Sequence, residues 1–177
     1  MTTRKTLIFS ILAASLILTA ITLTVPRASA QPTYQPVQVL RIQPYRCLPL
    51  GDRSGIFQEI HVPSASMVIL VSPWYMEGPQ YARDYVTNTA LRPTLGEAPI
   101  DNPRDYWAGE PTWAEDVMGI GAAWAQYWIY PAIGPLPDGR SLTVHWEIEM
   151  LKAVSDGDST APAGTVYIND CTIVWGE

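Results

Sequence analysis

The chain has 177 residues, with 17 acidic and 11 basic side chains. Three of the basic residues and none of the acidic ones lie in the first 30 positions, so residues 31–177 carry a net charge of 8 − 17 = −9. An acidic surface of this kind argues against nucleic acid and anionic lipid as partners and favours a neutral or cationic partner.

Residues 1–30 have the organisation of a secretory signal peptide. Arg4 and Lys5 precede an apolar run over 7–25, and Ala28-Ser29-Ala30 forms a small-residue cleavage site. We therefore expect a protein that is secreted or held in the cell envelope, with residues 31–177 as one domain. The alternative is an uncleaved membrane anchor, because the apolar run is nearly long enough to cross a bilayer.

Strand-like patterns recur along the mature chain, and no long amphipathic helix is evident. The expected strands are 37–44, 56–62, 67–74, 124–130, 141–150 and 165–175. Between the third and fourth strands, 75–121 contains five prolines and is interpreted as mostly loop, with a short strand over 85–91 and a helical turn over 113–117. These elements predict an all-β fold, an antiparallel β-sandwich, whose core includes Trp74, Trp113 and Trp146.

The alternation of side chains assigns a face to each residue of the two longest C-terminal strands. In 141–150 the inner residues are Leu142, Val144, Trp146, Ile148 and Met150, and the outer ones are Thr143, His145, Glu147 and Glu149. In 124–130 both faces hold large residues. If Ala125, Tyr127 and Ile129 face the core, the outer residues are Gln126, Trp128 and Tyr130.

Cys47 and Cys171 are the only cysteines. In an exported chain an even number of cysteines predicts a disulfide, which here would join the region of the first strand to the last strand. The alternative is two free thiols, one of them a nucleophile, although neither cysteine has a histidine beside it in a local catalytic signature.

Several of these runs resemble a known family, the jelly-roll carbohydrate-binding modules and their galactose-binding-like relatives. The run 164–173 (GTVYINDCTI) looks like the last strand of those modules, and 55–60 (GIFQEI) and 71–74 (VSPW) resemble two earlier strands. Trp113, Trp124 and 142–144 (LTV) follow in the family's order, so the similarity spans 55–173. The resemblance implies a jelly-roll sandwich that binds carbohydrate.

The same resemblance implies a structural calcium ion, which would be the only cofactor. Of the family's paired aspartates only Asp170 carries over, because its neighbour here is Asn169. A single aspartate is a poor site for a cation that requires six to eight oxygen ligands, so the alternative is a hydrogen-bonded carboxylate at a strand end.

The outer residues of the two C-terminal strands form the candidate binding site. Sugars present an apolar ring face edged by hydroxyl groups, and a flat aromatic side chain with amide, imidazole or carboxylate groups nearby suits them. The predicted ligand-binding residues are Gln126, Trp128, Tyr130, His145 and Glu147. The alternative is that the aromatic side chains pack beneath the loop 75–121 or against another domain.

Catalysis is not expected. Glu147 and Glu149 would lie about 7 Å apart on one strand face, within the range of a glycosidase pair, but carboxylates on a solvated face stay ionised and make poor general acids. The sequence has two histidines and lacks the serine-hydrolase, zinc-protease and phosphate-loop motifs. The sequence therefore predicts a non-catalytic carbohydrate-binding module. A structural or adhesion module that contacts another protein of the envelope is the alternative, and a glycoside hydrolase ranks third.

Overall fold

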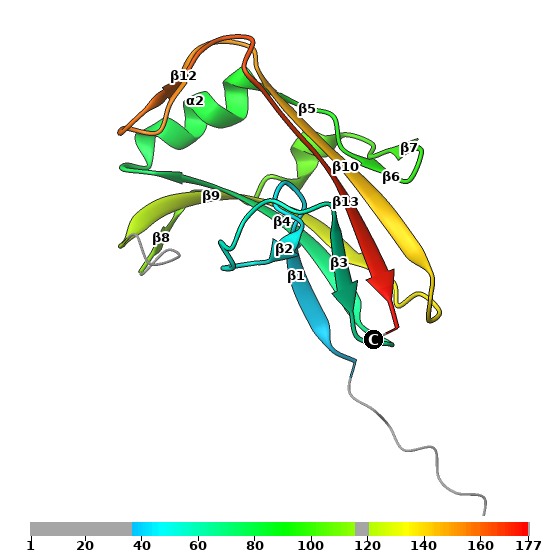
Figure 1. Cartoon of the computed structure of the whole chain (residues 1–177). Helices are drawn as coiled ribbons and strands as arrows, with labels where there is room; N and C mark the ends of the chain where they lie inside the picture. The colour runs from blue at the N-terminus through cyan, green and yellow to red at the C-terminus, as the bar shows by residue number, and fades with distance from the viewer. Residues whose placement is uncertain (1–36, 116–120, 177) are drawn as a thin grey trace, which may run out of the picture. The chain divides into compact units, whose positions relative to one another are not determined.

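The computed structural model describes residues 37–115 and 121–176, and these residues form two β-sheets with a small hairpin and one α-helix (Figure 1). Sheet A has five strands. Their order across the sheet is β2 (Leu48–Pro49), β1 (Val39–Gln43), β4 (Met67–Met76), β9 (Ala123–Ile133) and β8 (Thr112–Ala114).

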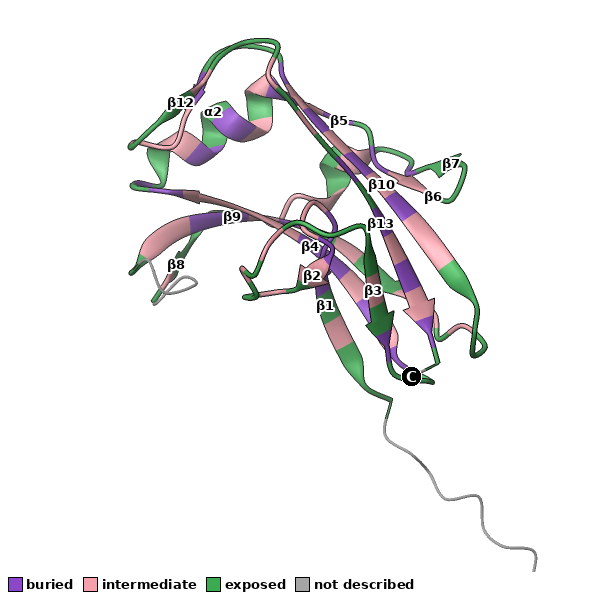
Figure 2. Ribbon diagram, viewed as in Figure 1, coloured by how far each residue is buried: buried purple, intermediate pink, exposed green. Residues whose placement is uncertain are grey.

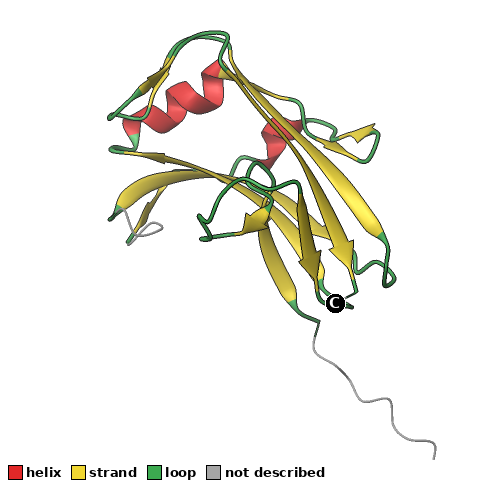
Figure 3. Cartoon of the chain, in the orientation of Figure 1, coloured by secondary structure: helices red, strands yellow, loops and turns green. Residues whose placement is uncertain are grey.

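Sheet B has six strands, and β10 (Ser141–Met150) pairs with most of the others. Their order is β3 (Glu59–Val62), β13 (Val166–Trp175), β10, β6 (Thr94–Leu95) and β7 (Ala98–Pro99), and β5 (Thr89–Leu91) also pairs with β10. The remaining elements are the helix α2 (Gln80–Asn88), the 3-10 helix η1 (Pro103–Tyr106) and the hairpin of β11 (Val154–Ser155) and β12 (Thr160–Ala161) (Figure 3).

The core lies between the inner faces of the two sheets, where the buried residues of Figure 2 gather. Trp128 of sheet A meets Trp146 of sheet B edge to face, with ring centroids 4.8 Å apart, a favoured geometry for aromatic pairs. The predicted all-β sandwich is therefore confirmed. Most strand pairings are antiparallel, while β1 with β4 and β3 with β13 are parallel.

The long strands lie where the sequence pattern predicts them. β10 coincides with 141–150, and its predicted inner residues are the ones that face the core, with Trp146 almost fully buried. β13 begins one residue later than predicted, β9 is longer, and β3 is limited to its last four residues.

The interpretation of 75–121 as mostly loop is wrong. A helix, four short strands and a 3-10 helix lie there, and Tyr85 belongs to α2 and not to a strand, which starts only at Thr89. Ala82 and Tyr85 are the buried residues of α2, so the apolar stripe of this short helix is too sparse to stand out from the sequence. Trp113 lies in β8 and is 51% exposed, so it is neither in a helical turn nor in the core, and Trp74 is partly buried.

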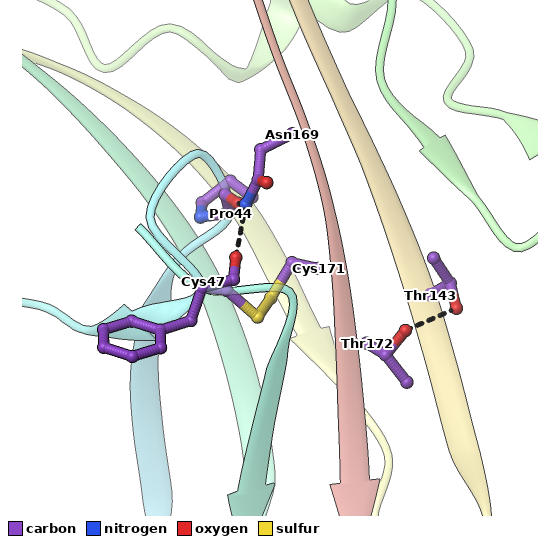
Figure 4. Close-up of a disulfide and its surroundings, with 7 residues drawn as sticks. Pro44, Cys47, Thr143, Asn169, Cys171 and Thr172 are labelled. Carbon is purple, nitrogen blue, oxygen red and sulfur yellow. Dashed lines mark hydrogen bonds between the residues drawn. A yellow bond between two sulfur atoms is a disulfide. The ribbon is translucent and has the colours of Figure 1, made fainter. Parts of the chain in front are cut away.

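The predicted disulfide is present (Figure 4). Cys47 and Cys171 are bonded, with their Cα atoms 5.1 Å apart, and both side chains are fully buried. The bond ties the turn that follows β1 to the middle of β13, and the amide of Asn169 donates to the Pro44 carbonyl of the same turn (3.3 Å). The disulfide thus links the two sheets.

The predicted signal peptide lies outside the described residues, as does the rest of 1–36. Among the residues that the structure describes, no helix has the length and apolar character needed to span a membrane.

Candidate functional site

The structure does not bring the five predicted binding residues together on one face. Trp128 is fully buried and Gln126 is 2% exposed, while Ile129, predicted to face the core, is exposed. The predicted faces are therefore inverted for Gln126, Trp128 and Ile129, while Ala125 is buried as predicted. Trp128 faces the core because the large apolar surface of its indole is buried there while the Nε1–H still donates to the Pro103 carbonyl (2.7 Å).

Gln126 and Tyr130, also predicted to face outward, lie on the same side of β9 as Trp128. The Gln126 amide donates to the Ala108 carbonyl (2.5 Å), which satisfies it below the surface. Tyr130 is partly buried and stacks against Trp128, with ring centroids 6.0 Å apart. These side chains therefore hold the sandwich together and do not form an exposed aromatic platform.

His145 and Glu147 do share a face, the outer face of sheet B, and both belong to a charged network. Arg92 donates to Glu147 (2.5 Å) and to Glu149 (2.6 Å). On the other side, His145 Nδ1 lies 2.6 Å from Asp170 Oδ1 and its Nε2 lies 3.6 Å from Glu147. The network extends from Arg92, which follows β5, across β10 to β13.

This network disfavours acid–base catalysis. The hydrogen bond from Arg92, with further help from His145, lowers the pKa of Glu147 below its ordinary value. A general acid at neutral pH needs the opposite shift. Glu147 therefore stays ionised, and its carboxylate is paired with the Arg92 guanidinium.

Asp170 does not fit a calcium site. Its carboxylate is exposed and hydrogen-bonded to His145, and among residues 37–115 and 121–176 no cluster of three or more metal-binding side chains exists. Calcium requires six to eight oxygen ligands, which this strand position does not supply. The hydrogen-bonded carboxylate is the arrangement that the structure displays.

A pocket of about 310 Å³ opens between the two sheets beside α2. It exists because β1 pairs with β4 only as far as Ile42 and Leu70, after which the chain turns away towards β13. Beyond that point β4 pairs with β9 on one side only, and its residues 72–75 line the pocket. Its aromatic lining residues are Tyr45, Trp74, Tyr75, Tyr85, Trp146 and Tyr167.

The disulfide fixes one wall of this pocket. Tyr45 and Arg46 line the pocket and immediately precede Cys47, in a turn closed by a hydrogen bond from the Cys47 N–H to the Gln43 carbonyl (2.7 Å). Tyr45 meets Tyr167 of β13 edge to face, with ring centroids 5.8 Å apart. The bond to β13 therefore holds two aromatic side chains in place on one side of the opening.

Trp74, which lines the pocket, has a stacked ring and a buried polar atom. Its ring stacks on Tyr85 with centroids 4.1 Å apart, and Tyr85 in turn contacts Trp107 edge to face. The Trp74 Nε1–H is buried and has no hydrogen-bond partner within the described part of the chain. A buried donor without a partner is costly, so a ligand that accepts a hydrogen bond here would gain from it.

Four polar residues complete the lining, the neutral Gln43 and Ser72 and the charged Arg46 and Asp156. The Gln43 amide donates to the Pro49 and Asp52 carbonyls, and the Asp156 carboxylate accepts hydrogen bonds from Asp158 and Ser159. Arg46 also donates to the Gly55 carbonyl (3.4 Å), which leaves it further donors. A second hollow of about 480 Å³ lies between α2 and 109–111, but no aromatic side chain lines it. The inter-sheet pocket is therefore the candidate site.

Sequence reasoning missed this pocket, although part of the signal was present. Ser72 and Trp74 continue the inner row of β4 after Leu70, and a polar residue in that row is a sign that the sheets separate there. Tyr45 is brought to the pocket only by the turn that the disulfide holds, which no local pattern reveals.

Together, the fold and the pocket define a two-sheet β protein with one inter-sheet disulfide and an aromatic-lined pocket. Comparison with protein-family models, curated proteins and solved structures finds no match to this chain.

Proposed function

We propose that this protein is an exported, non-catalytic binding module that holds a carbohydrate in the pocket between its sheets. The observation that carries the proposal is the aromatic lining of that pocket together with the buried, unpartnered Nε1–H of Trp74. The resemblance of 55–173 to jelly-roll carbohydrate-binding modules supports the same ligand class, and the signal-like residues 1–30 support export.

The dimensions of the pocket favour a small ligand. At about 310 Å³ it lies at the lower end of the range of small-molecule pockets, enough for one or two sugar rings. A sugar ring has a flat apolar face that packs on aromatic side chains and hydroxyl oxygens that accept hydrogen bonds from donors such as the Trp74 indole.

The charges of the lining favour a neutral ligand. One basic residue, Arg46, and one acidic residue, Asp156, line the pocket, so their formal charges cancel. The Arg46 guanidinium has donors beyond the one to the Gly55 carbonyl and can donate to a sugar hydroxyl. The Asp156 carboxylate accepts from Asp158 and Ser159, and its remaining lone pairs can accept from a hydroxyl. A neutral polyhydroxylated ligand uses both, whereas an ion would be repelled by one of them.

Trp74→Phe is the variant that tests the site. It keeps an aromatic ring against Tyr85 and removes the unpartnered donor. Trp113→Phe is the matched control, because Trp113 is 51% exposed and does not line the pocket. Residues 31–177 of the parent and both variants would be screened on a glycan array, and each positive sugar would be measured by calorimetry.

We expect one class of neutral sugar to bind the parent and the Trp113 variant, and its affinity for the Trp74 variant to fall by about tenfold or more, the usual cost of a lost hydrogen bond in a dry site. Circular dichroism and urea unfolding would show that all three are folded. A folded parent that binds no glycan would overturn the proposal, as would equal affinity of the two variants.

The alternative function, a structural or adhesion module that contacts another protein, is favoured by the outer face of sheet A. Ile129 is 42% exposed on that face and pairs with the apolar Val71, which is itself buried, whereas the outer face of sheet B carries the charged network of Arg92. Ile129→Lys would replace this exposed apolar side chain by a charged one. If the protein is an adhesion module, the variant should lose binding to isolated cell envelopes that the parent binds, with Ser141→Lys on sheet B as the control.

A further inference from the structure

The N-terminal half of β13, which contains Val166 and Ile168, is an open sheet edge. β3 pairs with β13 only from Thr172 to Trp175. Just before this paired stretch, the Asn169 amide donates to the Phe57 carbonyl (2.9 Å), the last hydrogen bond between β13 and the segment that leads into β3. Beyond that point, no strand among residues 37–115 and 121–176 pairs with Val166 or Ile168 on the side away from β10. In Figure 1 this half of β13 has β10 on one side only.

The hydrogen bonds of β13 show which backbone groups point to this edge. Trp175 N–H donates to Arg140 on the β10 side (3.0 Å), whereas Thr172 N–H donates to Gln58 on the β3 side (2.8 Å). Because successive residues of a strand point their backbone groups to opposite sides, Val166 and Ile168 share the direction of Thr172. Their N–H and C=O groups therefore lie along the open edge.

The side chains of these two residues are apolar and exposed. Val166 is 44% and Ile168 is 55% exposed, on the outer face of sheet B, where their neighbours on β10 are Glu149 and Glu147. Natural proteins usually protect such an edge with charge, proline or a covering element. Neither lysine nor proline occurs between 166 and 170.

We propose that this edge pairs with the same edge of a second copy of the chain, so that the two sheets B join across a twofold axis at Tyr167. Antiparallel pairing about Tyr167 sets Val166 opposite Ile168 of the partner, and Ile168 opposite its Val166. The four open backbone groups of each copy then form a set of reciprocal hydrogen bonds, and the two apolar side chains contact their counterparts across the strands.

The charges near the edge permit this register. Asp170 lies opposite Gly164 of the partner and Asn169 lies opposite its Thr165, so no like charges face each other across the axis. The Asp170 carboxylate is also hydrogen-bonded to His145 of its own chain. The net charge of −9 on residues 31–177 opposes association at a distance, so added salt should strengthen the dimer.

The pairing also concerns the inter-sheet pocket, because Tyr167 lines it. A twofold axis at Tyr167 brings two pockets close to one interface, which is the arrangement that raises the avidity of a weak binder for a repetitive ligand. The dimer itself requires no ligand, so its test is independent of the carbohydrate.

Analytical ultracentrifugation of residues 31–177 tests the association directly. Because only a short stretch pairs, we expect a weak dimer with a dissociation constant of about 10–100 µM, which Ile168→Lys weakens by at least about tenfold. Ser141→Lys is the matched control, since Ser141 lies on the same outer face but on β10, opposite Val174 of β13. A parent that stays monomeric up to about 1 mM overturns the proposal, as does equal association of the two variants.

Cross-linking tests the register. Only the residue on the axis lies opposite itself, in a non-hydrogen-bonded pair with Cα atoms about 4.5 Å apart, close enough for a disulfide. Tyr167→Cys should therefore give a covalent dimer on mild oxidation, and Ile168→Cys, although more exposed, should do so much more slowly. Equal cross-linking of the two variants, or none by Tyr167→Cys, refutes a twofold axis at Tyr167.

Discussion

Replacing Trp128 by alanine should remove a large part of the free energy of unfolding. The indole is fully buried, meets Trp146 with ring centroids 4.8 Å apart and donates to the Pro103 carbonyl. Truncating a buried tryptophan lowers the free energy of unfolding by about 3–5 kcal/mol. The Pro103 carbonyl, left without its hydrogen-bond donor, adds about 1–3 kcal/mol where water cannot reach it. We therefore expect a loss of at least about 4 kcal/mol, a large part of the 5–15 kcal/mol that holds a typical domain folded.

Urea unfolding, followed by circular dichroism, measures this loss, and Trp113→Ala is the reference. Trp113 is half-exposed and contacts Trp124 alone among the described aromatic rings, so its truncation should cost no more than about 1 kcal/mol. If instead Trp128→Ala were as stable as the parent and had lost sugar binding, Trp128 would lie on the surface, and the assignment of the two faces of β9 would be refuted.

Three other properties can be predicted from the contacts. Replacing Cys47 and Cys171 by alanine should lower the free energy of unfolding by about 5 kcal/mol on the chain-entropy model, because the bond joins residues 124 apart; a loss under about 2 kcal/mol in urea titrations would contradict this. Arg92→Met should raise the pKa of Glu147, because the hydrogen bond from Arg92 is the main cause of its lowered value. In the parent the ionised Glu147 stabilises the fold above the ordinary pKa of a glutamate, and this contribution is lost as the pH falls through the lowered pKa. An unchanged titration of the Glu147 carboxyl group by NMR would exclude its pairing with Arg92. Burial raises the pKa of Tyr75 to about 12, and it also raises the pKa of Tyr85, Tyr127 and Tyr130. An ultraviolet titration should therefore contain a late tyrosinate step that Tyr75→Phe makes smaller, and no change in its amplitude would show the Tyr75 phenol to be solvated.

The strands that the sequence predicts best are those with one clear inner face. In β10 every second residue is apolar, so only one arrangement buries a complete row, and the predicted faces are confirmed. In β9 both rows hold large side chains, and alternation alone cannot select between them. The choice depends on partners distant in sequence, chiefly Trp146 and the Pro103 carbonyl, and these contacts are known only from the structure.

The disulfide and the pocket show the same division between local and distant information. The even cysteine count, in a chain whose first residues predict export, is sufficient to predict the bond between Cys47 and Cys171. The pocket could not be predicted, since it requires that β1 end early, that the disulfide pull the next turn across to β13, and that α2 cover the far side. None of these events leaves a periodic pattern in the sequence.

The parts of the chain that leave regular pairing are concentrated in one region. Where β1 turns away from β4 the pocket opens, and where β3 ends beside β13 the open edge of Val166 and Ile168 begins, and the disulfide lies between these two departures. A sandwich that closed both sheets completely would have neither a pocket nor a free edge. The bond between Cys47 and Cys171 contributes stability here that strand pairing does not supply. Because both cysteines are fully buried, the test of this coupling is the Cys47→Ala/Cys171→Ala variant and not a reductant. Calorimetry at a temperature where the variant is folded should show weaker binding of the proposed sugar, because Tyr45 and Arg46 of the pocket lie in the turn that the bond holds.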